Sequence, residues 1–90
     1  MLFDPATLTG PQLRAARALL GVSGEELASE TRLGLATIRR AEAEAGVVKL
    51  TRANAQLIVA TLEGLGVQFL AADKTGGPGV RMAIKEARRR

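Results

Sequence analysis

Hydrophobic residues between positions 11 and 65 recur every three or four positions, which is the spacing of short amphipathic helices. A first helix is expected to begin at Gly10-Pro11, because a proline in the first helical turn forfeits no hydrogen bond. It is expected to end at Gly21, since glycine tolerates the left-handed conformation that closes many helices.

A second helix is predicted over residues 24–31. Ser23 is a good N-cap for it, and Glu26 three positions later completes a capping box. On this helix, Leu27 and Ala28 are expected to point inward.

Two further helices are predicted downstream. A tight turn at residues 32–34 leads into a helix over residues 35–44, which Gly46 is expected to end. Thr51 is the expected N-cap of the last helix, which ends near residue 64. The hydrophobic face of that helix consists of Ala55, Ile58, Val59 and Leu62, with Leu65 as an open fifth member.

After residue 66 the hydrophobic spacing changes to two. Residues 67–73 and 80–85 both alternate, and they flank the turn-rich segment KTGGPG, which predicts a β-hairpin. A competing interpretation continues the second segment as a short helix through Arg88. The three arginines at 88–90 form a basic tail in either case.

The expected fold is therefore mainly α. Residues 1–65 would form a four-helix bundle with a helix-turn-helix, residues 66–87 a β-hairpin that mediates dimerisation, and residues 88–90 the tail. The helix-turn-helix is predicted because two short helices are joined by a turn of three or four residues. Where such a pair binds DNA, its second helix lies in the major groove.

The composition argues against catalysis. The chain has no His, Cys, Tyr or Trp, which removes the commonest general bases, nucleophiles and metal ligands. We expect no enzyme, no cofactor and no metal site. No stretch approaches the roughly 18 hydrophobic residues of a membrane span, so a cytoplasmic protein without a membrane partner is expected.

The net charge of +4 is unevenly distributed. Residues 1–30 carry a net −2, whereas residues 31–60 and 61–90 each carry +3. A basic centre and C-terminal third indicate an anionic partner such as nucleic acid. A solvated basic surface without a partner explains the same charges, so the charges alone leave both interpretations open.

Residues 11–44 resemble the helix-turn-helix of the phage-type repressors, also called the xenobiotic-response-element family of regulators. The similarity lies in the segment QLRAARALLGVSGEELASETRLGLATIRRAE and extends more loosely through the fourth predicted helix. The later segment GVQFL…GGPGVR is similar to that of a subgroup of short bacterial regulators.

The resemblance implies roles for individual residues. The side chains that would read bases are Leu35, Ala36, Thr37 and Arg40. Phosphate contacts would come from Ser23, Arg39 and Lys49. Arg17 and Glu42 match an ion pair that joins the first and third helices. The buried positions that set the angle between the second and third helices would be Leu27, Ala28, Leu33 and Ile38.

The chemistry of the third helix fits these roles. A hydrophobic Leu35 or Ala36 suits a thymine methyl group, and Arg40 suits the O6/N7 edge of guanine. The alternative is that Leu35 packs into the bundle and that the arginines are only solvated.

Four residues depart from the family pattern. Gly24 replaces a glutamine that anchors a phosphate, so binding would depend more on arginines. Arg32 stands where the turn has a small residue, and Gly34 replaces a polar cap. Ala41 stands where a larger hydrophobic residue is common.

The expected function is a sequence-specific, double-stranded DNA-binding transcriptional regulator, a repressor or autoregulator that binds a palindromic site as a dimer. Activation through contact with RNA polymerase is equally open. RNA polymerase or a regulatory protein as a further partner stays open. The alternative is a protein-interaction module on the same fold, such as an antitoxin or an adaptor.

The C-terminal hairpin is the expected dimer contact. An isolated two-stranded hairpin is marginally stable in water, and its hydrophobic residues need a cover that a small bundle supplies only in part. These residues are Val67, Phe69, Val80, Met82 and Ile84. Pairing two hairpins about a two-fold axis would bury them. The alternative is a hairpin that folds back on the fourth helix within a monomer.

Overall fold

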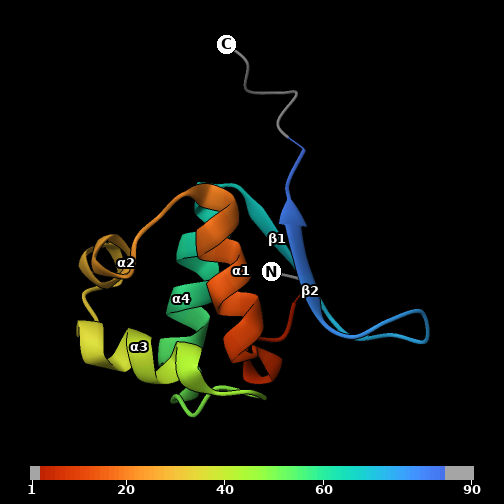
Figure 1. The fold of residues 1–90 in the computed structure, drawn as a ribbon, viewed down its shortest axis with the longest axis horizontal. Coiled ribbons are helices and arrows are strands. Elements are labelled where there is room, and N and C mark those ends of the chain that lie inside the picture. The colour runs from red at the N-terminus through yellow and green to blue at the C-terminus, as the bar shows by residue number, and fades with distance from the viewer. Residues whose placement is uncertain (1–2, 85–90) are drawn as a thin grey trace.

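The computed structural model describes residues 3–84. Four α-helices are followed by a two-stranded antiparallel hairpin, so the predicted mainly α fold is confirmed (Figure 1). The elements are η1 (Pro5–Thr7), α1 (Gly10–Leu20), α2 (Gly24–Thr31), α3 (Leu35–Ala43), α4 (Arg52–Leu65), β1 (Val67–Leu70) and β2 (Gly79–Met82). The short 3-10 helix η1 was not predicted. The basic tail and most of the competing helix through Arg88 lie outside the described residues.

Side-chain caps define where three of the four α-helices begin. Ser23 accepts a hydrogen bond from the N–H of Glu26, whose carboxylate accepts one from the Ser23 N–H, so the predicted capping box is confirmed. Thr51 caps α4 as predicted. Gly34, at the start of α3, offers no side-chain cap. Arg32 ends α2 with a left-handed φ of 61°, a conformation that favours glycine.

The core lies where α4 meets the other helices. Its largest fully buried side chains are Leu8, Leu13, Leu27, Ile38, Ile58, Val59 and Leu62. Each such side chain stabilises the fold by roughly 1.5–3 kcal/mol relative to exposure. The predicted buried positions Leu27 and Ile38 are confirmed, whereas Ala28 and Leu33 are only partly buried against the core. Among residues 3–84 no helix is long and hydrophobic enough to cross a membrane.

A short strap at residues 46–48 ties the connection between α3 and α4 to the start of α1. The Gly10 N–H donates to the Gly46 carbonyl at 3.1 Å, and the Val48 N–H donates to the Leu8 carbonyl at 2.9 Å. These bonds draw the chain out of the helix, and α3 ends at Ala43, next to the predicted last residue, Glu44.

The hairpin packs on the bundle of the same chain. Val67 and Phe69 are buried, at 2% and 5% exposure, and the Phe69 ring stacks on Phe3 with 5.4 Å between the ring centroids. The expectation that these two residues require cover from a second subunit is wrong, because α4, α1 and Phe3 supply it.

The rest of the expected dimer contact remains more accessible. Val80 is partly buried, whereas Met82 is 43% and Ile84 is 87% exposed. Val80 lies opposite Phe69 and Met82 lies opposite Val67 in the hairpin register. The hairpin therefore places one strand against the core and leaves the end of the other toward solvent.

Gln12 of α1 fixes the hairpin in place. Its Nε2 donates to the carbonyls of Leu70 and Gly79, at 3.1 and 3.0 Å, which lie opposite each other on β1 and β2. Its Oε1 accepts from the Thr9 N–H at 2.9 Å, and the residue is only 2% exposed. One buried side chain thus joins the start of α1 to both strands.

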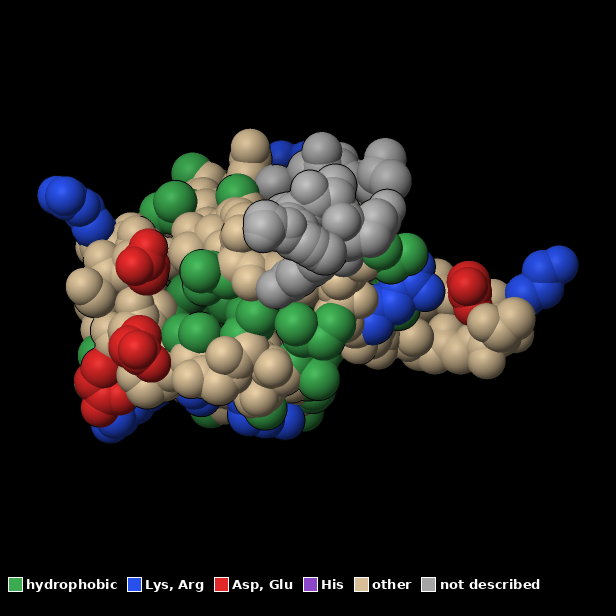
Figure 2. All heavy atoms as spheres, turned by 90° about the horizontal axis from the view of Figure 1, so that it is seen from above, with side chains coloured by type: hydrophobic (Ala, Val, Ile, Leu, Met, Phe, Trp, Pro, Cys, Tyr) green, Lys and Arg blue, Asp and Glu red, His purple; other side chains and the backbone are tan. Residues whose placement is uncertain are grey.

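Residues 71–78 are exposed and extend the hairpin beyond the body of the molecule (Figures 1 and 2). The Thr75 hydroxyl and N–H and the Gly76 N–H all donate to Oδ1 of Asp73. These hydrogen bonds, that of the Thr75 hydroxyl first, lower the pKa of Asp73 below its usual value. The tip is therefore held by its own polar contacts.

Candidate nucleic-acid interface

α3 lies along one end of the bundle, at the bottom of Figure 1, and buries a single face. Ile38 and Ala41 are buried at 0% and 2% exposure, whereas Ala36, Arg39 and Arg40 are exposed. The inward pair fixes the rotation of the helix about its axis. As a consequence, both arginines and the small Ala36 side chain face away from the core.

Leu35, at the start of α3, is partly buried. Its Cδ1 lies 3.4 Å from the position that a Cβ would take on Gly24, so the leucine covers the start of α2. The sequence left open whether Leu35 reads bases or packs into the bundle. Part of the side chain does pack, against the start of α2. Because residue 24 is a glycine, it has no side chain of its own between the α2 backbone and Leu35.

A groove of about 460 Å³ lies between α3 and the start of α4. Its polar lining consists of Thr37, Arg40, Glu44, Lys49, Thr51 and Asn54. Arg40 Nη2 donates to the Thr37 hydroxyl at 3.4 Å, and Lys49 Nζ lies 3.9 Å from a Glu44 carboxylate oxygen. The structure thus brings together three of the predicted DNA contacts, namely Thr37, Arg40 and Lys49.

The other two predicted phosphate contacts lie outside this groove. Arg39 Nη2 is 3.6 Å from a carboxylate oxygen of Glu25 on α2, and both side chains are 67% exposed. Such an exposed pair contributes little stability, so a phosphate can replace the carboxylate at small cost. Ser23 lies at the start of the same helix, where its hydroxyl caps α2.

The predicted ion pair between α1 and α3 is confirmed. Arg17 Nη2 donates to Glu42 Oε1 at 2.8 Å, and a second contact joins Arg17 Nε to Glu42 Oε2. Arg17 Nη1 also donates to the Val22 carbonyl at 2.9 Å. The hydrogen bond to Glu42 raises the pKa of Arg17, and burial offsets part of this effect. The Arg17 and Glu42 side chains are 23% and 12% exposed, so this ion pair, which holds α3 against α1, is partly desolvated.

Sequence reasoning did not find the contribution of α4 or the acidic counter-charges. Thr51 was predicted only as a cap, yet with Asn54 it forms one wall of the groove. The sequence did contain a signal for this wall, because polar residues stand at the start of the helix that follows Lys49. The partners Glu25 and Glu44 depend on how the helices pack, which the sequence pattern does not specify.

No protein-family model matches the chain, and no curated protein matches its sequence. Among residues 3–84, no group of three or more His, Cys, Asp or Glu side chains could hold a metal ion. The face around α3 offers two guanidinium groups, an ammonium group, hydroxyls and an amide beside a polar groove. In protein–DNA complexes, groups of these types form hydrogen bonds with phosphate oxygens and base edges.

Proposed function

We propose that the protein is a sequence-specific, double-stranded DNA-binding transcriptional regulator whose α3 enters the major groove. The observation that carries this proposal is the exposed face of α3. It combines Arg39 and Arg40 with the small Ala36, while Ile38 and Ala41 anchor the opposite face. A firmly anchored helix with a short side chain near its start can approach base edges closely.

Direct base reading is assigned to the first two turns of α3. The Arg40 guanidinium suits the O6/N7 edge of guanine, and the Ala36 methyl suits the methyl group of thymine. Thr37 accepts a hydrogen bond from Arg40, which supports an orienting role for its hydroxyl. Leu35 contributes the part of its side chain that does not cover α2.

Phosphate binding is assigned to the residues that flank α3. Arg39 and Lys49 are exposed cations, each close to a carboxylate, and Ser23 adds a hydroxyl at the start of α2. In the complex, DNA phosphates would replace Glu25 and Glu44 as their partners. Binding should therefore weaken steeply as the salt concentration rises.

We further propose that the regulator is a cytoplasmic repressor and binds a palindromic site as a homodimer. Two recognition helices about one DNA turn apart provide the specificity that one short helix lacks. The subunit contact is assigned to the accessible part of the hairpin, namely Val80, Met82 and Ile84. RNA polymerase or a regulatory protein would be a secondary partner.

The test compares two arginines that are adjacent on α3. A preferred sequence is first selected from a random DNA pool with the intact chain. Arg40→Ala is expected to cost about 1–3 kcal/mol at one base pair in each half-site, and so to relax sequence preference there. Arg39→Ala is expected to weaken all sequences alike and to reduce the salt dependence.

Fluorescence anisotropy at several salt concentrations measures both effects on selected and random duplexes. Equal losses for both variants on both duplexes would contradict the assigned roles. Binding to a protein partner that ignores salt, without measurable binding to DNA, would favour the interaction module instead.

A further inference from the structure

The hairpin tip, residues 71–78, takes no part in the DNA contacts assigned to α3 and its flanks. Its root is fixed by Gln12, whose Nε2 donates to a carbonyl of each strand. Beyond this root the tip leaves the body of the molecule as a narrow ribbon (Figures 1 and 2). A bridge between Asp73 and Gly76 closes the ribbon. Three residues on each arm therefore carry its end about 10 Å past the last pair of the ladder.

The root of the tip lies beside the end of α3. Gly10, two residues before Gln12, packs so closely on α3 that a Cβ on it would lie 2.9 Å from the Ala41 carbonyl oxygen. The Gly10 N–H also donates to the Gly46 carbonyl, in the connection that leads to Lys49. The start of α1 therefore joins the end of α3 to the root of the tip. In Figure 1 the tip lies at the level of α3, on the side of its C-terminal end.

Lys74 gives the tip a positive charge that the described part of the chain does not neutralise. The carboxylate of Asp73 is adjacent, yet its Oδ1 accepts three hydrogen bonds from the tip itself. Lys74 makes no ion pair with Asp73 or with any other of the residues 3–84. Arg39 and Lys49 differ, because they lie 3.6 and 3.9 Å from carboxylate oxygens. The exposed ammonium group of Lys74 is thus available to a phosphate.

The glycines of the tip leave its main chain open to a ligand. Apart from chain neighbours, nothing lies within 4 Å of the position that a Cβ would take on residues 76, 77 or 79. The Gly77 N–H donates to no carbonyl of residues 3–84. Backbone N–H groups commonly donate to phosphate oxygens in protein–DNA complexes. The tip thus offers one ammonium group and one backbone donor, without side chains that would keep a phosphate away.

We propose that the hairpin tip binds the phosphate backbone of the duplex that α3 reads, through Lys74 and the Gly77 N–H. This inference rests on the proposed function, because it places the duplex along the exposed face of α3. A duplex in that position continues past the C-terminal end of α3, where the tip leaves the body. Such a contact carries no sequence information of its own. It adds affinity and fixes the orientation of the protein on the duplex.

The chemistry of the tip favours phosphates over a protein partner and over base edges. Residues 71–78 contain no hydrophobic side chain larger than proline, whereas protein interfaces depend on large hydrophobic and aromatic anchors. The tip also lacks the Arg, Asn and Gln side chains that make bidentate contacts with base edges. Its lysine is a compact point charge, which suits a phosphate oxygen.

Substitutions of Lys74 test the charge, with fluorescence anisotropy on selected and random duplexes. Lys74→Ala should weaken binding to both alike, by about fivefold at low salt. It should also lower the salt slope by about 1 for each bound subunit. Lys74→Arg, which keeps the charge, should retain most of the affinity.

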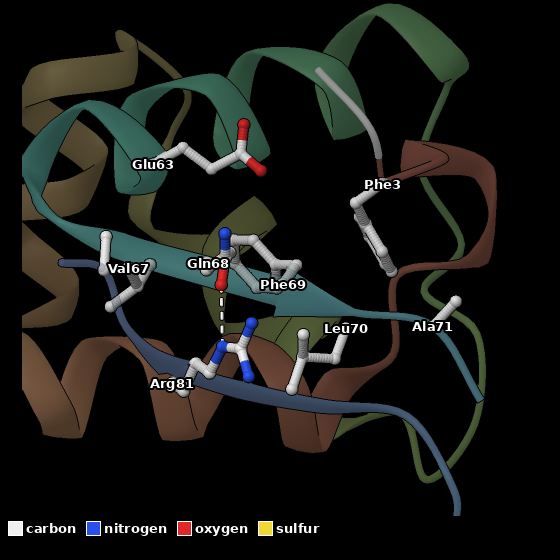
Figure 3. Close-up of a pocket in the computed structure, with 9 residues that line it drawn as sticks. Phe3, Glu63, Val67, Gln68, Phe69, Leu70, Ala71 and Arg81 are labelled. Carbon is white, nitrogen blue, oxygen red and sulfur yellow. Dashed lines mark hydrogen bonds between the residues drawn. The ribbon is translucent and has the colours of Figure 1, made fainter. Parts of the chain in front are cut away.

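Arg81→Ala is the matched control. It removes an equal charge from β2, where Gln68 holds the guanidinium through a 2.6 Å hydrogen bond beside a hollow of about 510 Å³ (Figure 3). Because this charge lies away from the tip and is screened by salt, the affinity should change less than about twofold. Equal losses for Lys74→Ala and Arg81→Ala would show only a general charge effect and would overturn the proposal.

Removal of the tip tests the whole contact. Leu70 and Gly79 form the last pair of the ladder, so an Asn-Gly turn can join them directly in place of residues 71–78. Gln12 keeps both of its carbonyl partners in this shortened variant. In hydroxyl-radical footprinting of the selected duplex, the intact chain should protect backbone positions outside the α3 half-site, and the shortened variant should not. Identical footprints would overturn the proposal.

The same measurements separate this proposal from the proposed function. If the intact chain binds no duplex, the DNA-binding proposal fails, and the tip contact fails with it. If Arg40→Ala relaxes the sequence preference while Lys74→Ala and the shortened variant bind as the intact chain does, only the tip contact is wrong. A loss of affinity for both tip variants, with the preference for the selected sequence kept, is the expected result.

Discussion

Gly10 lies where α1 approaches the end of α3 most closely. A Cβ at this position would stand 2.0 Å from the Glu44 carbonyl oxygen and 2.9 Å from that of Ala41. Both neighbours are backbone atoms and cannot rotate away. Gly10→Ala is therefore expected to lower the free energy of unfolding by about 3 kcal/mol or more, measured by urea denaturation.

Gly64 provides the matched control. It lies in α4, and apart from the neighbouring backbone of its own helix no atom lies within 4 Å of the position that its Cβ would take. Alanine suits a helix interior better than glycine does, so Gly64→Ala should stabilise the protein by about 0.5–1 kcal/mol. If both variants change the unfolding free energy in the same direction, the close approach at Gly10 is not as described.

Glu42 makes a different kind of contribution, through charge. Glu42→Ala would leave Arg17 partly buried without its carboxylate. Breaking a fully buried pair costs about 3–5 kcal/mol, so a loss of roughly 2–3 kcal/mol is expected for this partly exposed one. Glu44→Ala, which removes a 3.9 Å contact to an exposed lysine, should cost less than about 1 kcal/mol. An unchanged melting temperature for Glu42→Ala would show that the pair acts as an ordinary surface contact.

At the scale of elements, local sequence signals were enough to predict the four α-helices. The caps at Ser23 and Thr51 and the glycine at position 21 act within three or four residues, and each helix begins or ends near its signal. The strap at residues 46–48 was not predictable in this way, because its hydrogen bonds join residues about forty positions apart. Such contacts depend on how the helices pack.

Gln12 is a second case in which the local sequence pattern does not reveal a long-range contact. It completes a capping box with Thr9, three residues before it, and this box was not predicted. Its bonds to Leu70 and Gly79, however, span 58 and 67 residues and leave no trace in the local pattern. The residue that docks the hairpin therefore looked like part of a helix start.

Substitution of Gln12 tests its role in docking the hairpin. Gln12→Ala would remove a buried donor from carbonyl groups of both strands, at a cost of about 1–3 kcal/mol. Hydrogen exchange should increase in the hairpin more than in α2. Gln56→Ala, an exposed change on α4, should alter neither measurement. Uniform acceleration of exchange across all elements would indicate a general loss of stability instead.

At the scale of the whole molecule, the candidate site was predicted in part. Thr37, Arg40 and Lys49 meet in one groove because they lie on α3 and the connection that follows it. The hairpin was predicted as an element, but Val67 and Phe69 were assigned to a second subunit, whereas they pack on their own chain. Alternation shows that Val67 and Phe69 share a face, yet it does not tell whether that face meets the same chain or another.

The molecule has two distinct ends, and this constrains any dimer. α3 lies at one end, while α1, α4 and β2 terminate at the other (Figure 1). Exposed hydrophobic residues occur in those last turns and at the end of β2, and hydrophobic side chains gather on this face in Figure 2. They are Leu19, Leu65, Met82 and Ile84. For both α3 helices to face one duplex, the two-fold axis must run from one end to the other, so that the subunits stand side by side.

A double substitution at the end of the hairpin tests that arrangement. Truncation of the hairpin is unsuitable, because it would remove Val67 and Phe69 from the core. Met82→Lys with Ile84→Lys adds charge to side chains that are 43% and 87% exposed and should leave the fold intact. We expect this variant to be monomeric by light scattering and to lose affinity for a palindrome but not for a single half-site. Leu57→Lys, at a position on α4 that is 40% exposed, should remain dimeric. If the unmodified chain is monomeric at tens of micromolar, where dimers with a Kd of about 1 μM persist, the dimer proposal is wrong.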